Sequence, residues 1–220
     1  MEYLHWDEKT ITDFSPENIE SMYQKGYVFT RKGKGVMQQT RSFKINTDNF
    51  ELNSENRRIL KKVPDIALTV QNLPLDNYDF LIAKIGKDFY DTKFGKGIMS
   101  AQKIKEMLTE PNKSNFNALL TFNTGLNTGY VISFISKNIL HYSYPFYSLD
   151  KEGKDLGLAM MIKAIEYAKN SGIKEVYLGS LQRPNDTYKL QFESCQWFDG
   201  QKWNSDLDKA KKILKEKSQN

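Results

Sequence analysis

The segment from Tyr147 to Lys189 constrains the fold of this chain more than any other part. Its apolar spacing predicts the end of a strand, a glycine-containing loop, an amphipathic helix and a short strand over 175–180. In the loop, Lys154 precedes Gly157 and Ala159 in the pattern basic-x-x-Gly-x-Ala. Glycine at this point lets backbone N–H groups approach an anion, and the helix adds the positive end of its dipole. Lys154, Gly157 and Ala159 are therefore predicted to hold a phosphate, such as the pyrophosphate of coenzyme A or a phosphate near an RNA 3′ end. A plain helix start with a solvated lysine is the alternative.

The N-terminal part of the chain predicts a mixture of helices and strands. Ser15 and Pro16 begin a helix that stops at Gly26. The other expected elements are strands over 27–31 and 35–46 joined by a turn at 33–35, a short helix over 55–62, a buried strand over 66–70, and helices over 78–93 and 100–109.

From residue 117 the pattern changes to strands. Strands are expected over 117–123, 129–135 and 139–147, followed by the loop and its helix, the strand 175–180, a helix over 186–194, a hairpin or strand over 195–203 and a basic terminal helix over 205–217. Three strands, a loop and helix, a strand, a helix and a strand is the order of the acetyltransferase-like (GNAT) core. The predicted fold class is α+β, with a mixed, mostly antiparallel sheet flanked by helices. We place a domain boundary near 63–76, which separates a basic half, 1–70, from a GNAT-like half, 71–220.

Composition and charge narrow the class of partner. The net charge is +5, and the segment 31–62 alone has nine basic and three acidic residues. A local basic excess of this kind is typical of phosphate contacts, although a solvated basic face is an equally good interpretation. Because the 220 residues hold one cysteine and two histidines, no metal site is expected. No apolar run is long enough to span a membrane and the first twenty residues are acidic, so we expect a cytoplasmic chain without membrane contact.

Several stretches together resemble the bacterial aminoacyl-tRNA–protein transferases of the N-degron pathway. The matching stretches are 22–31, 43–70, 94–101 and 146–189, and their most specific points are Arg57-Arg58, Leu156-Gly157, Tyr177-Leu178-Gly179 and Tyr188-Lys189. The resemblance implies two GNAT-like halves. It also implies transfer of arginine or leucine from charged tRNA to the N-terminal α-amine of an acceptor protein, with neither cofactor nor DNA involved.

The chain departs from this family at one place. Where the family carries an N-terminal cysteine cluster, this sequence reads GKGVMQQTRS over 33–42, which offers no metal ligand. The chain therefore resembles a variant of the family that lacks the cluster.

The resemblance also assigns roles to individual residues. Tyr188 and Lys189 follow the strand 175–180, where a tyrosine can protonate a leaving group and a lysine can offset oxyanion charge. An aromatic helix face with an exposed lysine is an equally good interpretation of this pair. Arg183 could bind an acidic acceptor side chain bidentately, although a surface arginine is the commoner explanation.

Arg57 and Arg58 are adjacent on a short helix and must point in different directions, so one at most is expected to face the core or site and the other solvent or RNA. A lone histidine in a strand, such as His141, is more often structural than catalytic.

Two other functions remain open on these residues. The same loop could place acyl-coenzyme A for a GNAT-type acyltransferase. Alternatively, the chain could bind tRNA without catalysing a transfer, having lost the chemistry together with the cysteines.

Overall fold

The computed structural model describes residues 4–125, 128–149 and 155–216. It divides into two compact units, each built from separate stretches of the chain. Unit 1 contains Met1–Asn53, Ser136–His141 and Ala168–Asn220, and unit 2 contains Ser54–Ile135 and Tyr142–Tyr167. The units therefore do not coincide with the continuous segments 1–70 and 71–220, and the predicted domain division stays a prediction.

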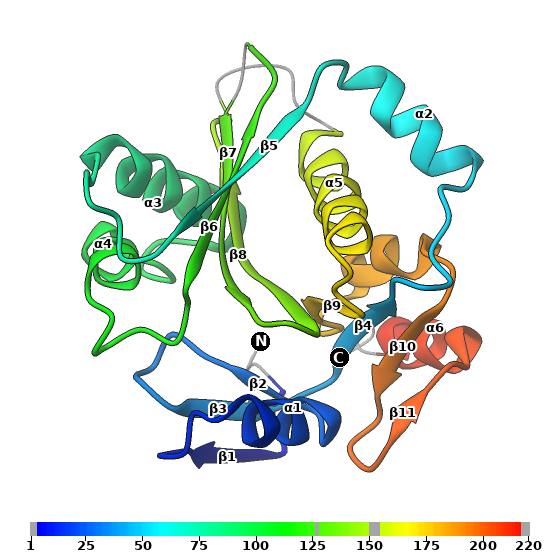
Figure 1. Cartoon of the computed structure of the whole chain (residues 1–220). Coiled ribbons are helices and arrows are strands. Elements are labelled where there is room, and N and C mark those ends of the chain that lie inside the picture. The colour runs from blue at the N-terminus through cyan, green and yellow to red at the C-terminus, as the bar shows by residue number, and fades with distance from the viewer. Residues whose placement is uncertain (1–3, 126–127, 150–154, 217–220) are drawn as a thin grey trace. The chain divides into compact units, whose positions relative to one another are not determined.

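Unit 1 contains two groups of strands. Its elements are β1 (Asp7–Thr10), α1 (Pro16–Gln24), β2 (Tyr27–Phe29), β3 (Val36–Gln39), β4 (Ser42–Asn46), the start of β8, β9 (Glu175–Ser180), the 3-10 helix η1 (Pro184–Gln191), β10 (Cys195–Phe198), β11 (Trp203–Asn204) and α6 (Leu207–Glu216). One group has the order β1-β3-β2, and the other the order β11-β10-β4-β9-β8 (Figure 1). The pairs β4–β9 and β4–β10 are antiparallel, whereas β8 and β9 pair in parallel.

The predicted strand over 35–46 is wrong, because the chain forms two strands there. β3 pairs with β1 and β2, while β4 pairs with β9 and β10. Between them, Thr40 N–H donates to the Gly26 carbonyl at 3.4 Å, and the Arg41 carbonyl accepts from Leu181 N–H at 2.8 Å. Residues 38–42 are polar, but no glycine or proline among them marks a turn, so the sequence carries no clear signal for the break.

Unit 2 is a sheet with helices on both faces. Its elements are α2 (Ser54–Lys62), β5 (Ala67–Asn72), α3 (Phe80–Phe94), α4 (Ala101–Thr109), β6 (Ala118–Asn123), β7 (Thr128–Ile135), most of β8 (Ile139–Tyr147) and most of α5 (Leu156–Asn170). The strand order is β8-β7-β6-β5, and Figure 1 shows α3 and α4 on one side of these strands and α5 on the other. On the first side a Cβ at Gly86 of α3 would stand 3.2 Å from the Phe146 ring, and on the second a Cβ at Gly129 would stand 2.4 Å from the Met160 sulfur of α5.

The predicted fold class is confirmed: the chain is α+β, with mixed and mostly antiparallel strands flanked by helices. The chain order of strands β6, β7 and β8, a loop, α5 and then β9 is also the predicted one. Two local predictions are wrong. β5 is an exposed to half-buried edge strand and not a buried one, and the predicted helix over 186–194 is the 3-10 helix η1.

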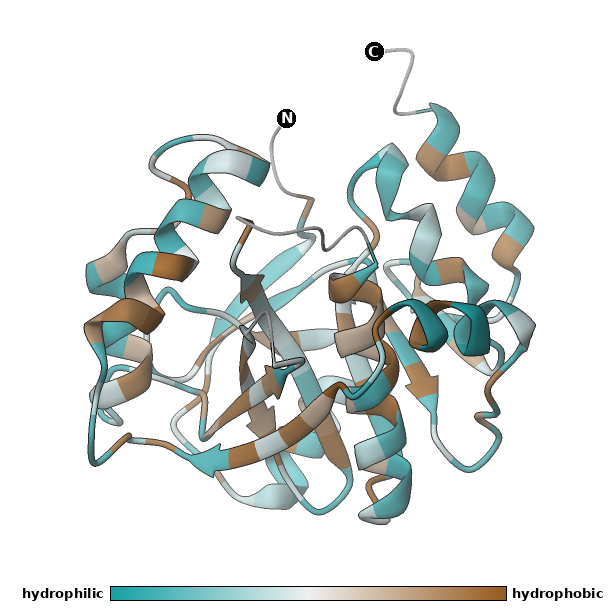
Figure 2. Ribbon diagram, turned by 90° about the horizontal axis from the view of Figure 1, so that it is seen from above, coloured by the Kyte–Doolittle hydropathy of each residue, from teal (hydrophilic) through white to brown (hydrophobic). Residues whose placement is uncertain are grey.

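The predicted terminal helix is present as α6. Apolar residues alternate with hydrophilic ones along it (Figure 2), and its buried residues are Ala210 and Leu214. Burial of such a stripe stabilises a surface helix more than its intrinsic propensity does.

Candidate functional site

The predicted phosphate loop is partly visible. Lys154 lies outside the described residues, and α5 begins at Leu156. Gly157 is half-buried, and a Cβ there would stand 3.1 Å from the Tyr147 ring. Ala159 is fully buried, and its N–H donates to the Asp155 carbonyl at 2.9 Å. The Ala159 amide is therefore used within the helix. The backbone amides that helix geometry leaves free for an anion are those that precede Ala159 at the start of α5.

A carboxylate also lies at this end of α5. Asp155 directly precedes the helix, and its Oδ2 is 2.9 Å from the Lys62 ammonium. A negative charge at a helix N-terminus is stabilising and competes with any bound phosphate. Lys62, from α2, offsets that charge.

Both arginines predicted for tRNA or substrate binding are exposed on α2. The Arg58 guanidinium donates to Glu55, with Nε 2.7 Å from Oε2. The interaction with Glu55 raises the pKa of Arg58, which is fully ionised in any case. The buried side of α2 consists of Asn56 and Ile59, so neither arginine faces the core of unit 2.

The predicted catalytic pair occupies two different environments. Tyr188 is 45% exposed, whereas Lys189 is buried at 7% exposure. The Lys189 ammonium donates to the Ser180 carbonyl at 2.9 Å and lies 3.6 Å from Asp186 Oδ1. Tyr188 thus presents an exposed ring on η1, while Lys189 is a buried and paired cation beside the end of β9.

Arg183 is exposed at the start of η1. The other oxygen of Asp186, Oδ2, accepts from the backbone N–H groups of Gln182 and Arg183, at 2.7 and 2.8 Å. Asp186 therefore fixes both the turn that presents Arg183 and the ammonium of Lys189. These residues all belong to unit 1, whereas Arg57, Arg58, Gly157 and Ala159 belong to unit 2.

His141 is buried in unit 1 and is held by a tyrosine. Its Nδ1 shares a hydrogen bond of 2.9 Å with the Tyr23 hydroxyl. Burial lowers the pKa of His141 to about 3, so the imidazole is neutral at physiological pH. Burial likewise raises the pKa of the Cys195 thiol to about 11. Neither group suits general-base or nucleophilic work at pH 7.

Several basic residues of the segment 31–62 are neutralised by acids of the chain itself. Lys44 is 5% exposed, and its ammonium lies 2.6 Å from Glu175, which also accepts from the Tyr177 hydroxyl at 2.8 Å. Other ion pairs of the segment are Lys32 with Glu8, Arg58 with Glu55 and Lys62 with Asp155. The free positive charge of this segment is therefore smaller than its composition suggests.

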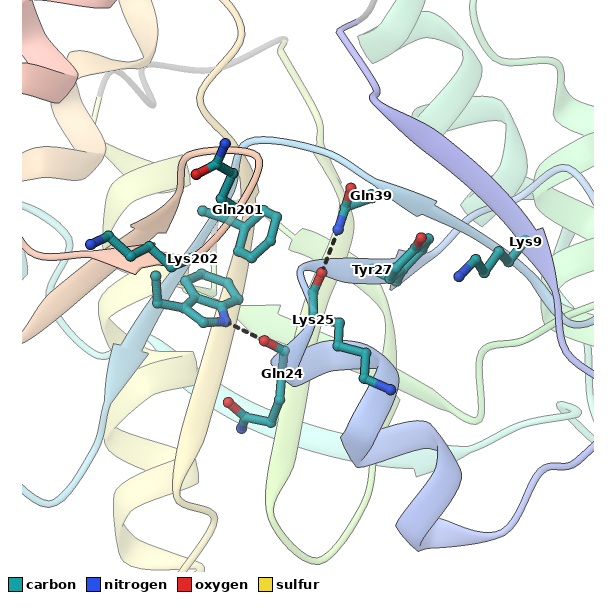
Figure 3. Close-up of a pocket in the computed structure, with 9 residues that line it drawn as sticks. Lys9, Gln24, Lys25, Tyr27, Gln39, Gln201 and Lys202 are labelled. Atoms are coloured by element: carbon teal, nitrogen blue, oxygen red, sulfur yellow. Dashed lines mark hydrogen bonds between the residues drawn. The ribbon is translucent and has the colours of Figure 1, made fainter.

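A polar pocket lies on unit 1, close to Lys44. Its volume is about 430 Å³, and its lining comprises Lys9, Gln24, Lys25, Tyr27, Gln39, Phe198, Gln201, Lys202 and Trp203. Figure 3 shows α1, the strands β2 and β3, and the hairpin β10–β11 around it. Two hydrogen bonds fix its base, from Trp203 Nε1 to the Gln24 carbonyl and from Gln39 Nε2 to the Lys25 carbonyl, each 2.8 Å long.

No sequence pattern described above predicts this pocket. Its lysines, Lys9, Lys25 and Lys202, all lie outside the basic segment 31–62. They meet because β3 pairs with β1 and β2, and because the turn at Gly26 packs on Phe198. No local pattern carries that information.

Neither a cluster of metal ligands nor a membrane-spanning helix is found in the described residues. Across residues 4–125, 128–149 and 155–216, no group of three or more histidine, cysteine or acidic side chains could hold a metal ion. Within the same ranges, no helix has the length and apolar character needed to cross a membrane.

Comparison with known proteins gives one partial sequence match. No protein-family model matches the chain. Over 85 residues the chain is 29% identical to the aspartate/glutamate leucyltransferase of Stenotrophomonas maltophilia (strain K279a). The match covers 36% of this chain and 34% of that protein, so it spans about a third of the relative's length.

Solved structures give distant likenesses, each with a TM-score of 0.46. L-PGS from Bacillus licheniformis is 11% identical, with 75% of this chain and 52% of that one covered. The C-terminal domain of a putative lysylphosphatidylglycerol synthetase from Agrobacterium fabrum is also 11% identical, with 80% and 55% covered. A GCN5-related glucosamine N-acetyltransferase region of a fungal β-N-acetylglucosaminidase is 5% identical, with 86% and 22% covered. A TM-score of 0.46 is too low for these likenesses to support a function.

Proposed function

We propose that this chain is an acyltransferase that moves an aminoacyl group from charged tRNA to the N-terminal α-amine of an acceptor protein. The observation that carries the proposal is the 29% identity over 85 residues with a protein named aspartate/glutamate leucyltransferase. The stretches 22–31, 43–70, 94–101 and 146–189 add the resemblance in sequence described above.

The proposed chemistry needs little acid–base catalysis. The α-amine attacks the carbonyl carbon of the aminoacyl ester, a C–N bond forms, and the C–O bond to the tRNA ribose breaks. The amine loses a proton and the leaving ribose oxygen gains one. An ester is already activated, and an α-amine with a pKa of about 7.7–8.0 keeps a useful neutral fraction near pH 7, so positioning supplies most of the acceleration. A neutral, buried His141 and a protonated Cys195 are compatible with such a reaction.

Two residues of η1 have proposed roles. Tyr188, the exposed member of the pair, is the proton donor to the leaving ribose oxygen. Lys189, held by Ser180 and Asp186, is a positioning residue that keeps η1 against the end of β9. Arg183, exposed beside them, is the proposed contact for an acidic acceptor side chain.

The test is transfer of labelled leucine or arginine from charged tRNA onto peptides with each class of N-terminal residue. We expect labelled peptide with an acidic N-terminal residue. No labelling with either charged tRNA, for any acceptor, would contradict the proposal. Labelling from acetyl-coenzyme A in the absence of tRNA would support the competing acyltransferase instead.

Tyr188→Phe separates the chemical role from a structural one. Because Tyr188 is exposed, removal of its hydroxyl should leave the stability unchanged and lower kcat by a factor of about 100, with KM for charged tRNA unaffected. Tyr167→Phe removes a hydroxyl from the half-buried side of α5 and serves as the matched control. Equal kcat values for the two variants would remove Tyr188 from the mechanism.

A further inference from the structure

The lining of the unit 1 pocket has a clear chemical bias. Of its nine residues three are lysines, three are glutamines and three are aromatic, and none is acidic. Three positive charges around a hollow of about 430 Å³ favour an anionic ligand. The aromatic rings and amides favour one that also has a planar, hydrogen-bonding part.

Two of the lysines are available for such a ligand. Lys25 and Lys202 are exposed, and neither has an ion pair within the described parts of the chain. Lys9 is 3.9 Å from Asp7 and lies over the Tyr27 ring at 4.9 Å, so its ammonium already has partners within unit 1. Figure 3 shows Lys25 and Lys9 on one side of the pocket and Lys202 on the other.

One ring of the pocket is suited to stacking. Tyr27 and Phe198 are buried, at 5% and 2% exposure, whereas Trp203 is half-buried. The hydrogen bond from the indole N–H to the Gln24 carbonyl fixes the ring, and the Lys44 ammonium lies 4.3 Å from its centroid. A fixed, partly exposed indole offers the kind of surface on which nucleic-acid bases stack.

We propose that this pocket binds one nucleotide of a single-stranded RNA segment. Lys25 and Lys202 contact the phosphates, the base stacks on Trp203, and the exposed amide of Gln201 can pair with the base edge. This inference rests on the proposed function, in which the donor is an RNA, and it gives that RNA a contact in addition to those at the reacting ester.

The first experiment measures binding of a short oligoadenylate to the full chain by tryptophan fluorescence at several salt concentrations. Lys25→Gln with Lys202→Gln should weaken binding about tenfold and reduce the salt slope by about 1.4, since each contact to a single strand contributes about 0.7. Lys212→Gln with Lys215→Gln is the control, because it removes the same charge from exposed positions of α6 outside the pocket lining. This double variant should change the affinity and the salt slope less than the pocket double variant does. Equal losses in the two double variants would overturn the proposal, because they would show that only the total charge matters.

The second experiment tests the base and the strand separately. Trp203→Phe should weaken oligoadenylate binding several-fold and remove most of the fluorescence quenching. An abasic oligomer of equal charge should bind more weakly than oligoadenylate, and so should free AMP. Equal affinity of the abasic oligomer would overturn the stacking role, and equal affinity of AMP would overturn the assignment to a strand.

Transfer assays on the same variants distinguish this inference from the proposed function. Unchanged KM for charged tRNA in Lys25→Gln with Lys202→Gln would overturn the inference and leave the proposed function standing. Pocket-dependent RNA binding in a chain that transfers nothing would instead contradict the proposed function and support the inference.

Discussion

At the scale of the residue, burial determines the chemistry of His141. The imidazole is 3% exposed and shares a hydrogen bond with the Tyr23 hydroxyl. Burial lowers its pKa from the ordinary value of 6.5 to about 3. Between these two values the unfolded chain binds a proton that the native chain does not. The free energy of unfolding should therefore decrease by about 1.4 kcal/mol for each pH unit between 6.5 and 3, through this group alone.

Urea unfolding of His141→Gln at pH 6, 5 and 4 checks this expectation. Glutamine keeps a hydrogen-bonding group near the Tyr23 hydroxyl but does not titrate. As the pH falls, the free energy of unfolding of the variant should decrease less steeply than that of the wild-type chain. The difference in slope should correspond to about one bound proton. Parallel curves for the two proteins would show that the native imidazole is charged.

At the scale of the element, the turn between α1 and β2 depends on Gly26. Its φ is +80°, and a Cβ there would stand 2.4 Å from the ring of Phe198 on β10. Gly26→Ala should therefore combine backbone strain with a steric clash and lower the free energy of unfolding by about 3 kcal/mol. Gly172, also in unit 1, has a φ of +73° with nothing within 4 Å of a Cβ.

Gly172→Ala is the matched control, with an expected loss of about 1 to 2 kcal/mol from strain alone. Equilibrium unfolding in urea measures both variants. Equal losses would show that Phe198 moves away from the turn without cost.

The elements also show what a sequence can predict. α1 was predictable because Ser15, Pro16 and Gly26 are local signals for its start and end. The break between β3 and β4 was not, because it is a change of partner strand, set by pairings with β1, β2, β9 and β10 and not by a local turn signal. The phosphate loop could be proposed from a short motif, whereas the pocket depends on pairings between segments far apart in the chain. Similarly, no pattern around Lys44 reveals that it is buried against Glu175.

At the scale of the whole molecule, neither unit is a continuous segment. Unit 2 needs both 54–135 and 142–167, and the second stretch supplies the fully buried side chains of Phe146, Met160 and Ile162. A fragment covering 54–135 should therefore lack a cooperative thermal transition, whereas a fragment covering 54–167 should show one by circular dichroism. A cooperative transition in the shorter fragment would mean that α5 and β8 are dispensable for the core of unit 2.

The divided layout of unit 1 has a consequence for synthesis on the ribosome. Segment 1–53 emerges first, but its partners in β9 and β10 are translated more than a hundred residues later. Unit 2 has all its residues by 167, so it can fold while segment 1–53 still waits for the end of translation. The pocket that Lys9, Lys25 and Trp203 line can form only after β11 has been translated. Chains that terminate before β11 should therefore lack this pocket and the RNA binding that we propose for it.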